Sequence, residues 1–169
     1  AEADGMTALH WAARADDLAS VQLLLRSGAN AKAANRYGIT PLSLAATNGS
    51  APVIDALLAA GADPNSANSD GETVLMIAAR SGKADAVKAL IARGAKVNAR
   101  ENWQDQTALM FAAAENNAAA IKVLVEAGAD MNLTSKVWDF PEYKYQTNGM
   151  AVFQLPRGGW TALMFAARQ

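Results

Sequence analysis

The chain repeats one short pattern, and this repetition limits the possible folds more than any other feature. A threonine opens a small alanine-rich apolar segment five times, at Thr7, Thr40, Thr73, Thr107 and Thr161. A Gly-Ala pair follows four of these segments, at Gly28, Gly61, Gly94 and Gly128. A period of about 33 residues indicates stacked units, each of which contacts its neighbours. We therefore expect one array over residues 1–169, with units at about 4–36, 37–69, 70–104 and 105–158 and a truncated unit at 159–169.

The spacing of these landmarks separates a constant part of each unit from a variable part. The count from threonine to the next Gly-Ala is 21 residues in all four complete units. The count from Gly-Ala to the next threonine is 12, 12, 13 and finally 33 residues. Surface connections tolerate insertions, whereas packed elements do not. The constant part is therefore predicted to be packed, and the last connection to carry an insertion at about 133–158.

Each constant part is predicted to form two short helices. The threonine suits the N-cap, where its hydroxyl accepts a free backbone N–H, and apolar residues then recur at helical spacing. Four residues that tolerate a left-handed backbone separate the two helices: Asp16, Gly49, Gly82 and Asn116. The glycine of Gly-Ala is expected to end the second helix. The Gly, Asn and Asp residues of the connection predict turns or a short β-finger.

Taken together, these landmarks resemble those of the ankyrin repeat. The pattern T-P/A-L-H-x-A-A, two helices and G-A-D-x-N recurs four times and covers nearly the whole chain. The resemblance implies an all-α repeat solenoid of stacked helix-turn-helix units with β-hairpin fingers. The family's histidine survives only as His10, and Lys32 replaces the finger asparagine that is present as Asn65, Asn98 and Asn132. The heptapeptide TALMFAA is similar in style to bacterial ankyrin proteins.

Composition and charge argue against several classes of function. The formal net charge is −1, so no basic surface for nucleic acid is indicated. No apolar run approaches the roughly 18 residues of a membrane span. With no cysteine and one histidine, neither a histidine-based triad nor a multi-histidine metal site is expected. We expect no catalytic residues, no metal and no cofactor, and a structural role for His10 as a hydrogen-bond partner of the neighbouring finger. The composition favours no compartment.

The resemblance implies a protein partner that binds the concave face and the finger tips. Three arginines share one position on that face, which predicts either an acidic partner or a plain solvated surface: Arg14, Arg80 and Arg168. Exposed Tyr, Trp, Met and Arg side chains are enriched in interface cores, although Tyr37 and Trp103 also suit packing between fingers. The candidate partner-binding residues are Met6, Arg14, Arg36, Tyr37, Ile39, Asp70, Glu72, Arg80, Trp103, Gln104, Gln106, Glu115 and Trp160.

The insertion is the most aromatic part of the chain, with six of the eleven aromatic residues between Trp138 and Trp160. Asn148-Gly149 is a strong signal for a two-residue hairpin turn, so an inserted β-hairpin with strands at 142–147 and 150–155 is predicted. Its aromatic side chains either pack on the adjacent fingers or form a patch for a partner. A small-ligand pocket under the insertion is a third interpretation. The residues concerned are Trp138, Phe140, Tyr143, Tyr145 and Phe153.

The truncated unit has no later helix in this sequence to cover Leu163, Met164 and Phe165. Because repeat arrays need polar caps, we expect a fragment of a longer array, or another molecule at this end, including end-to-end self-association. The sequence thus predicts a non-catalytic protein–protein interaction scaffold. The alternative is a substrate-recognition or regulatory domain cut from a larger enzyme.

Overall fold

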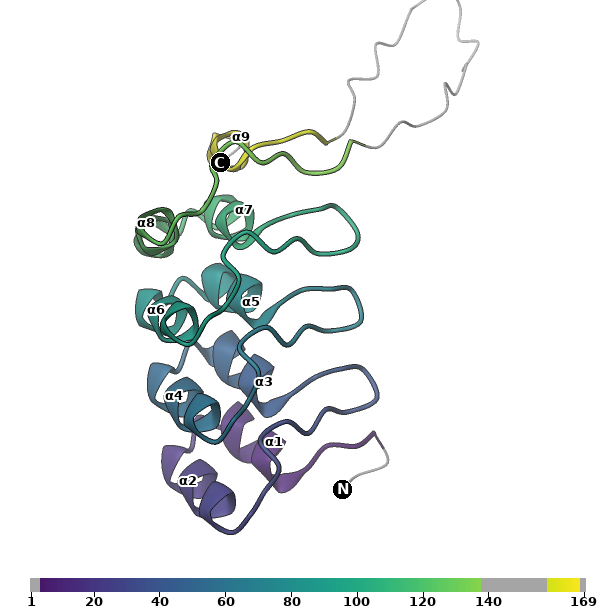
Figure 1. Cartoon of the computed structure of the whole chain (residues 1–169), viewed down its shortest axis with the longest axis vertical. Helices are drawn as coiled ribbons and strands as arrows, with labels where there is room; N and C mark the ends of the chain where they lie inside the picture. Colours follow the sequence, from purple (N-terminus) through teal and green to yellow (C-terminus); the bar gives the residue numbers. More distant parts are fainter. Residues whose placement is uncertain (1–3, 138–157, 168–169) are drawn as a thin grey trace, which may run out of the picture.

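The computed structural model describes residues 4–137 and 158–167, and within them the chain forms nine short helices. Figure 1 shows two stacked columns, α1, α3, α5, α7 and α9 in one and α2, α4, α6 and α8 in the other. The bounds are Ala8–Arg14 (α1), Leu18–Arg26 (α2), Pro41–Asn48 (α3), Ala51–Ala59 (α4), Val74–Ser81 (α5), Ala84–Ala92 (α6), Ala108–Ala114 (α7), Ala118–Glu126 (α8) and Ala162–Ala166 (α9). The predicted α repeat solenoid is confirmed.

Neighbouring units bury one continuous core between them. Each helix packs against the next in its own column, and α1, α3, α5 and α7 each also pack against the helix that follows in sequence. The leucine two residues after each of the first four threonines is buried, as are the alanine pairs that follow it. Burial of such a leucine is worth roughly 1.5–3 kcal/mol. The small alanines explain how successive helices of the first column can lie so close together.

All five repeat threonines occupy helix N-cap positions, as predicted. The hydroxyls of Thr40 and Thr73 accept hydrogen bonds from the backbone amides of Ser43 and Met76, at 3.1 and 3.3 Å. Thr7 differs because its amide and hydroxyl both meet the Nδ1 atom of His10, at 3.2 and 2.8 Å. A threonine is therefore the N-cap residue in every unit, while the hydrogen-bond partners of its hydroxyl and amide differ between units.

His10 links the first unit to the second. The ring is fully buried, and its Nε2 atom lies 3.0 Å from the carbonyl oxygen of Ile39. A carbonyl only accepts hydrogen bonds, so Nε2 carries the proton and Nδ1 accepts from Thr7. The structural role predicted for this histidine is confirmed.

The backbone reverses at the predicted positions. The residues between the two helices of each complete unit have positive φ angles: Asp16, Gly49, Gly82 and Asn116. The glycines of the four Gly-Ala pairs also have positive φ, between 85° and 89°. Each lies two residues beyond its helix, where a left-handed residue closes the helix end.

Asparagines join consecutive units on the outer edge of the stack. Asn65 donates to the carbonyl of Gly94 at 3.2 Å and accepts from the amide of Lys96 at 2.9 Å. Asn98 makes the same pair of bonds one unit later, to Gly128 at 3.1 Å and from Asp130 at 2.9 Å. Lys32 has no side-chain acceptor, so it cannot form this pair of bonds at the first junction.

The connections between units are turns, not the β-hairpin fingers that we expected. We name them the first finger (27–40), the second finger (60–73) and the third finger (93–107). In the part of the chain that the structure describes, their only β pairing is a single bridge between Ala67 and Thr73. The reason is local, because the Oδ1 atom of Asn68 accepts the amides of Asp70 and Glu72, both at 3.0 Å. A side chain thus takes bonds that a second strand would otherwise supply.

The predicted inserted hairpin, with Trp138, Phe140, Tyr143, Tyr145 and Phe153, lies outside the described residues. The structure does describe the base from which this insertion leaves. The amide of Ser135 donates to the carbonyl of Trp160 at 3.0 Å, and Gly159 donates back to Ser135 at 3.1 Å. The amide of Lys136 donates to Gln104 of the third finger at 2.7 Å. The insertion therefore starts and ends side by side, next to the third finger.

Candidate functional site: a cleft between the second and third fingers

A cleft of about 640 Å³ lies between the second and third fingers and the helices that follow them. It is lined by Ser69, Asp70, Glu72, Arg80, Glu101, Asn102, Trp103, Gln104, Gln106 and Phe111. The second finger supplies one wall, the third finger the other, and α5 and α7 supply Arg80 and Phe111. The fingers are held together by the amide of Asn102, which donates to the carbonyl of Asp70 at 2.9 Å.

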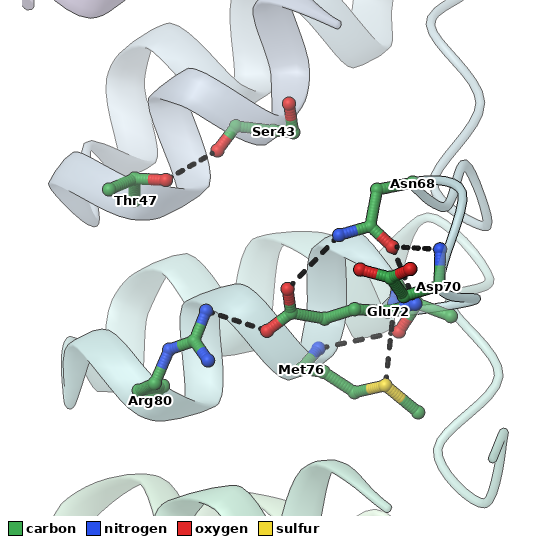
Figure 2. Close-up of polar contacts among 8 residues, drawn as sticks. Ser43, Thr47, Asn68, Asp70, Glu72, Met76 and Arg80 are labelled. Atoms are coloured by element: carbon green, nitrogen blue, oxygen red, sulfur yellow. Dashed lines mark hydrogen bonds and ion pairs between the residues drawn. The ribbon is translucent and has the colours of Figure 1, made fainter. Parts of the chain in front are cut away.

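An ion pair forms the side of the cleft nearest α5. Glu72 lies just before the N-cap of α5 and Arg80 lies in its last turn, so the pair spans the length of this helix. The guanidinium of Arg80 lies 2.6 Å from the Oε1 atom of Glu72, and Asn68 donates to Oε2 at 3.2 Å (Figure 2). Glu72 is mostly buried and Arg80 is about half exposed. Both carboxylate oxygens thus have a partner, although Oε1 is held by the ion pair alone and forms no hydrogen bond, while the guanidinium still faces solvent.

A buried carboxylate shapes the opposite wall. Glu101 accepts three backbone amides of its own finger, from Trp103 at 2.6 Å, Gln104 at 2.7 Å and Gln106 at 2.9 Å. These bonds wrap the third finger around the carboxylate, which compensates its burial. The wrapped turn carries Trp103 outward, with 65% of its surface exposed.

Arginine side chains lie over aromatic rings on α1, in the first finger and on α7. The guanidinium of Arg80 lies 5.4 Å from the ring centre of Phe111, across the boundary between two units. Arg14 lies over Trp11 at 5.4 Å, and Arg36 lies over Tyr37 at 4.7 Å. These distances are within the range of cation–π attraction. The concave face and finger tips therefore combine cationic and aromatic groups along much of the stack.

A scan against family models matches ankyrin repeats (3 copies) over residues 1–68 and 42–135. Together these matches cover well over half of the chain. The chain belongs to the ankyrin-repeat family. A comparison with curated proteins finds no match. Ankyrin repeats in general serve as protein–protein interaction modules, which is the class of function predicted from the sequence.

The ankyrin fold brings part of the predicted surface together in this cleft. Six of the candidate residues line it: Asp70, Glu72, Arg80, Trp103, Gln104 and Gln106. Arg14, Arg36, Tyr37 and Glu115 are exposed elsewhere on the array, and Ile39 and Trp160 are partly buried. The ring of Trp160 packs on Phe165 with their centres 5.5 Å apart.

The prediction that Met6 belongs to the exposed surface is wrong. This residue was included among the exposed candidates, but it is buried, and Asn35 of the first finger contacts its sulfur at 3.7 Å. The first finger covers it, so Met6 stabilises the array and offers no surface to a partner. Arg168, the third member of the predicted arginine row, lies outside the described residues. At the equivalent position of the second unit, Thr47 bonds its own helix at the carbonyl of Ser43 (Figure 2).

Four residues that line the cleft were not among the candidates: Ser69, Glu101, Asn102 and Phe111. Two of them, Phe111 and Glu101, shape its walls. Phe111 lies four residues after its threonine, a position that also holds Trp11 and Phe165. That aromatic recurrence is the available signal, although Leu44 and Ile77 at the same position are residues typical of a core. Glu101 gave no signal, because an acidic residue in a turn is ordinarily solvated.

Among the described residues, no group of three or more His, Asp or Glu side chains is placed to hold a metal ion. No helix in the described ranges is long and apolar enough to cross a membrane.

Proposed function

We propose that this ankyrin array is a non-catalytic scaffold that binds a protein partner through its concave face and finger tips. The single observation that carries the proposal is the cleft between the second and third fingers. It joins an exposed tryptophan, a phenylalanine and an arginine in one concavity. Tryptophan and arginine are prominent among interface hot spots, which lie in well-packed pockets near the centre of an interface. The surrounding amides of Asn102, Gln104 and Gln106 suit the polar rim of such a contact.

Two of the three carboxylates of the cleft support a binding role over a catalytic one. Glu72 is neutralised by Arg80, and Glu101 is held by three backbone amides. A general acid or base needs a proton-transfer atom that can reach a substrate. The only histidine is buried with both ring nitrogens engaged in the first unit, far along the stack from this cleft.

Site-specific crosslinking tests this proposal. A photoreactive amino acid is introduced at Gln104, in the cleft, and in a second protein at Lys88, on the outer helix α6. Both proteins are then exposed to a lysate of the source cells, and the adducts are identified by mass spectrometry. We expect one defined protein adduct from position 104 and none from position 88. Equal labelling from both positions, or adducts that persist after Trp103→Ala and Phe111→Ala together, would contradict the proposal.

Two further surfaces belong to the same proposal. The aromatic insertion, as a β-hairpin or in another form, would enlarge the surface beside the third finger. Exposed Leu163 and Met164 would allow end-to-end self-association. Sedimentation velocity over a concentration series tests the latter, since Leu163→Lys with Met164→Lys should abolish any association. If the array instead serves as the substrate-recognition or regulatory domain of a larger enzyme, the crosslinked protein will be that enzyme's substrate or its own catalytic domain.

A further inference from the structure

We propose that the cleft between the second and third fingers recognises an arginine side chain of the partner, with Asp70 as the group that binds its guanidinium. This inference rests on the proposed function and specifies the chemistry of the bound segment. It is argued from three features: the excess of carboxylates in the cleft, the partners that each charged group already has, and the contacts of the array's own arginines with aromatic rings.

The cleft carries an excess of negative charge. Three carboxylates line it, those of Asp70, Glu72 and Glu101, against the single guanidinium of Arg80. Two of the three are already satisfied, because Glu72 is bound by Arg80 and Asn68, and Glu101 by its own finger. Asp70 is exposed, and its carboxylate forms no hydrogen bond or ion pair with the described part of the chain. An incoming cation therefore meets an available carboxylate within a negative cleft.

An acidic partner fits this cleft less well. Its natural anchor would be Arg80, but this guanidinium is bound at 2.6 Å to Glu72 and also lies over the Phe111 ring. An anion would have to compete with Glu72 and approach Asp70 at the same time. Like charges across an interface oppose binding. Arg80, one of the arginines that suggested an acidic partner, is thus already neutralised by Glu72.

The aromatic groups favour arginine over other cations. Guanidinium groups stack on aromatic faces and bind carboxylates through two parallel N–H donors, whereas an ammonium is a strongly hydrated point charge. The array already uses this geometry with its own arginines at Trp11, Tyr37 and Phe111. The cleft offers the same two elements to a partner, with Asp70 on the second finger and the exposed Trp103 on the third.

Amide groups around the cleft can hold the main chain of the bound segment. Gln104 and Gln106 bond each other through their side chains at 2.6 Å, which orients both at the edge of the cleft. Each retains further donors or acceptors for a peptide backbone. The structure therefore fits an extended segment whose arginine side chain enters between the fingers.

Matched short peptides test the chemistry directly. The probe is acetyl-Ala-Arg-Ala-amide, and the controls replace arginine with citrulline, which keeps the shape without the charge, or with glutamate. Binding is followed by two-dimensional NMR of the isotope-labelled protein, with the Trp103 indole signal assigned from a Trp103→Phe variant. We expect saturable shifts at Trp103, Asp70 and Gln104 with the arginine peptide and at least about fivefold weaker binding of the citrulline peptide.

Three variants isolate the carboxylate. Asp70→Asn should weaken the arginine peptide about threefold, and Gln104→Glu, which adds a carboxylate to the opposite wall, should strengthen it by a similar factor. Asp55→Asn removes the same charge from the exposed surface of α4 and should leave binding unchanged. Asp70 makes no side-chain bond to the described residues, so its variant should fold, and circular dichroism verifies this.

Several outcomes would overturn the inference. These are equal binding of the arginine and citrulline peptides, preferential binding of the glutamate peptide, no shift at any cleft residue, or an equal loss in the Asp70 and Asp55 variants. A partner crosslinked at position 104 in the absence of arginine-peptide binding would leave the scaffold function standing and refute only the arginine specificity. Arginine-peptide binding without any crosslinked protein would do the reverse.

Discussion

The heptapeptide TALMFAA occurs twice in the chain, at 107–113 and at 161–167, and the two copies have opposite environments. In α7, Leu109 and Met110 are 2% and 1% exposed, because α5 and α9 cover the helix on both sides. In α9, Leu163 and Met164 are 77% and 54% exposed, because only the α7 side is covered within the described chain (Figure 1). Identical residues thus adopt the same local structure while only one copy is buried. In a stacked array, the neighbouring units decide which side chains contribute to the core.

The largest expected effect tests this contrast directly. Leu109→Ala should lower the free energy of unfolding by about 2–5 kcal/mol, because it leaves a cavity between three units. Leu163→Ala, the same change in the same heptapeptide, should alter it by no more than about 0.5 kcal/mol, since the side chain is exposed. Urea denaturation followed by circular dichroism measures both. A cost at Leu163 comparable to that at Leu109 would show that something else covers α9.

The same contrast explains how far the sequence could predict the structure. The helices follow from threonine caps and left-handed residues such as Gly49, which act within one unit, so their positions were predictable. Burial at Met6 was not, because it depends on a contact with Asn35 of the first finger, far along the chain from Met6. The cleft itself was only half predictable. Trp103 is marked by its exposed turn, whereas Phe111 is partly buried, as are Leu44 and Ile77 at the same position of other units. Its place in the cleft depends on contacts with the preceding unit, such as the one with Arg80. Local signals predict elements, while packing between units decides exposure.

The link made by His10 should show the second largest effect. His10→Leu removes the acceptor of the Thr7 amide and the donor to the Ile39 carbonyl, and should cost about 2 kcal/mol. His10→Met should cost less, about 1 kcal/mol, because Met76 at the equivalent position accepts the Thr73 amide through sulfur at 3.3 Å. Thermal and urea unfolding of the two variants measure the difference. Equal losses would mean that the volume of the ring, and not its hydrogen bonds, joins the first two units.

Changes to the asparagine links between units should lower or raise the free energy of unfolding by a smaller amount. Asn98→Ala removes two bonds between the third and fourth units and should cost about 1 kcal/mol. Lys32→Asn would supply the equivalent link at the first junction, to the carbonyl of Gly61 and the amide of Asp63, and should stabilise the array by up to about 1 kcal/mol. Urea midpoints give both values. Lys32→Ala is the control, because it removes the lysine without adding the link. If Lys32→Ala stabilises as much as Lys32→Asn, the gain comes from losing the lysine.

The smallest expected effect concerns the opposite end of the stack. Helix α2 buries only Val21, whereas α4, one unit further in, buries Val53, Ile54, Leu57 and Leu58. The end helix therefore depends more on its own N-cap, Asp17. The hydroxyl of Ser20 donates to the Asp17 carboxylate at 2.5 Å and its amide donates at 3.0 Å, and chiefly the hydroxyl bond lowers the pKa of Asp17 below its usual 3.8.

A lowered pKa in the folded state fixes the sign of the pH dependence. The folded protein binds the Asp17 proton less readily than the unfolded chain, so this stabilisation is present above the usual pKa of 3.8 and is lost as the pH falls through the lowered value. The difference in urea midpoint between the protein and Asp17→Asn, which keeps a capping oxygen without the charge, should thus stay constant above about pH 5 and shrink below it. Repeating the comparison in a Ser20→Ala background should reduce this pH dependence, because the main cause of the pKa shift is gone. A difference that widens on acidification would mean that the charge of Asp17 destabilises the folded end unit, and that the end helix is held by packing alone.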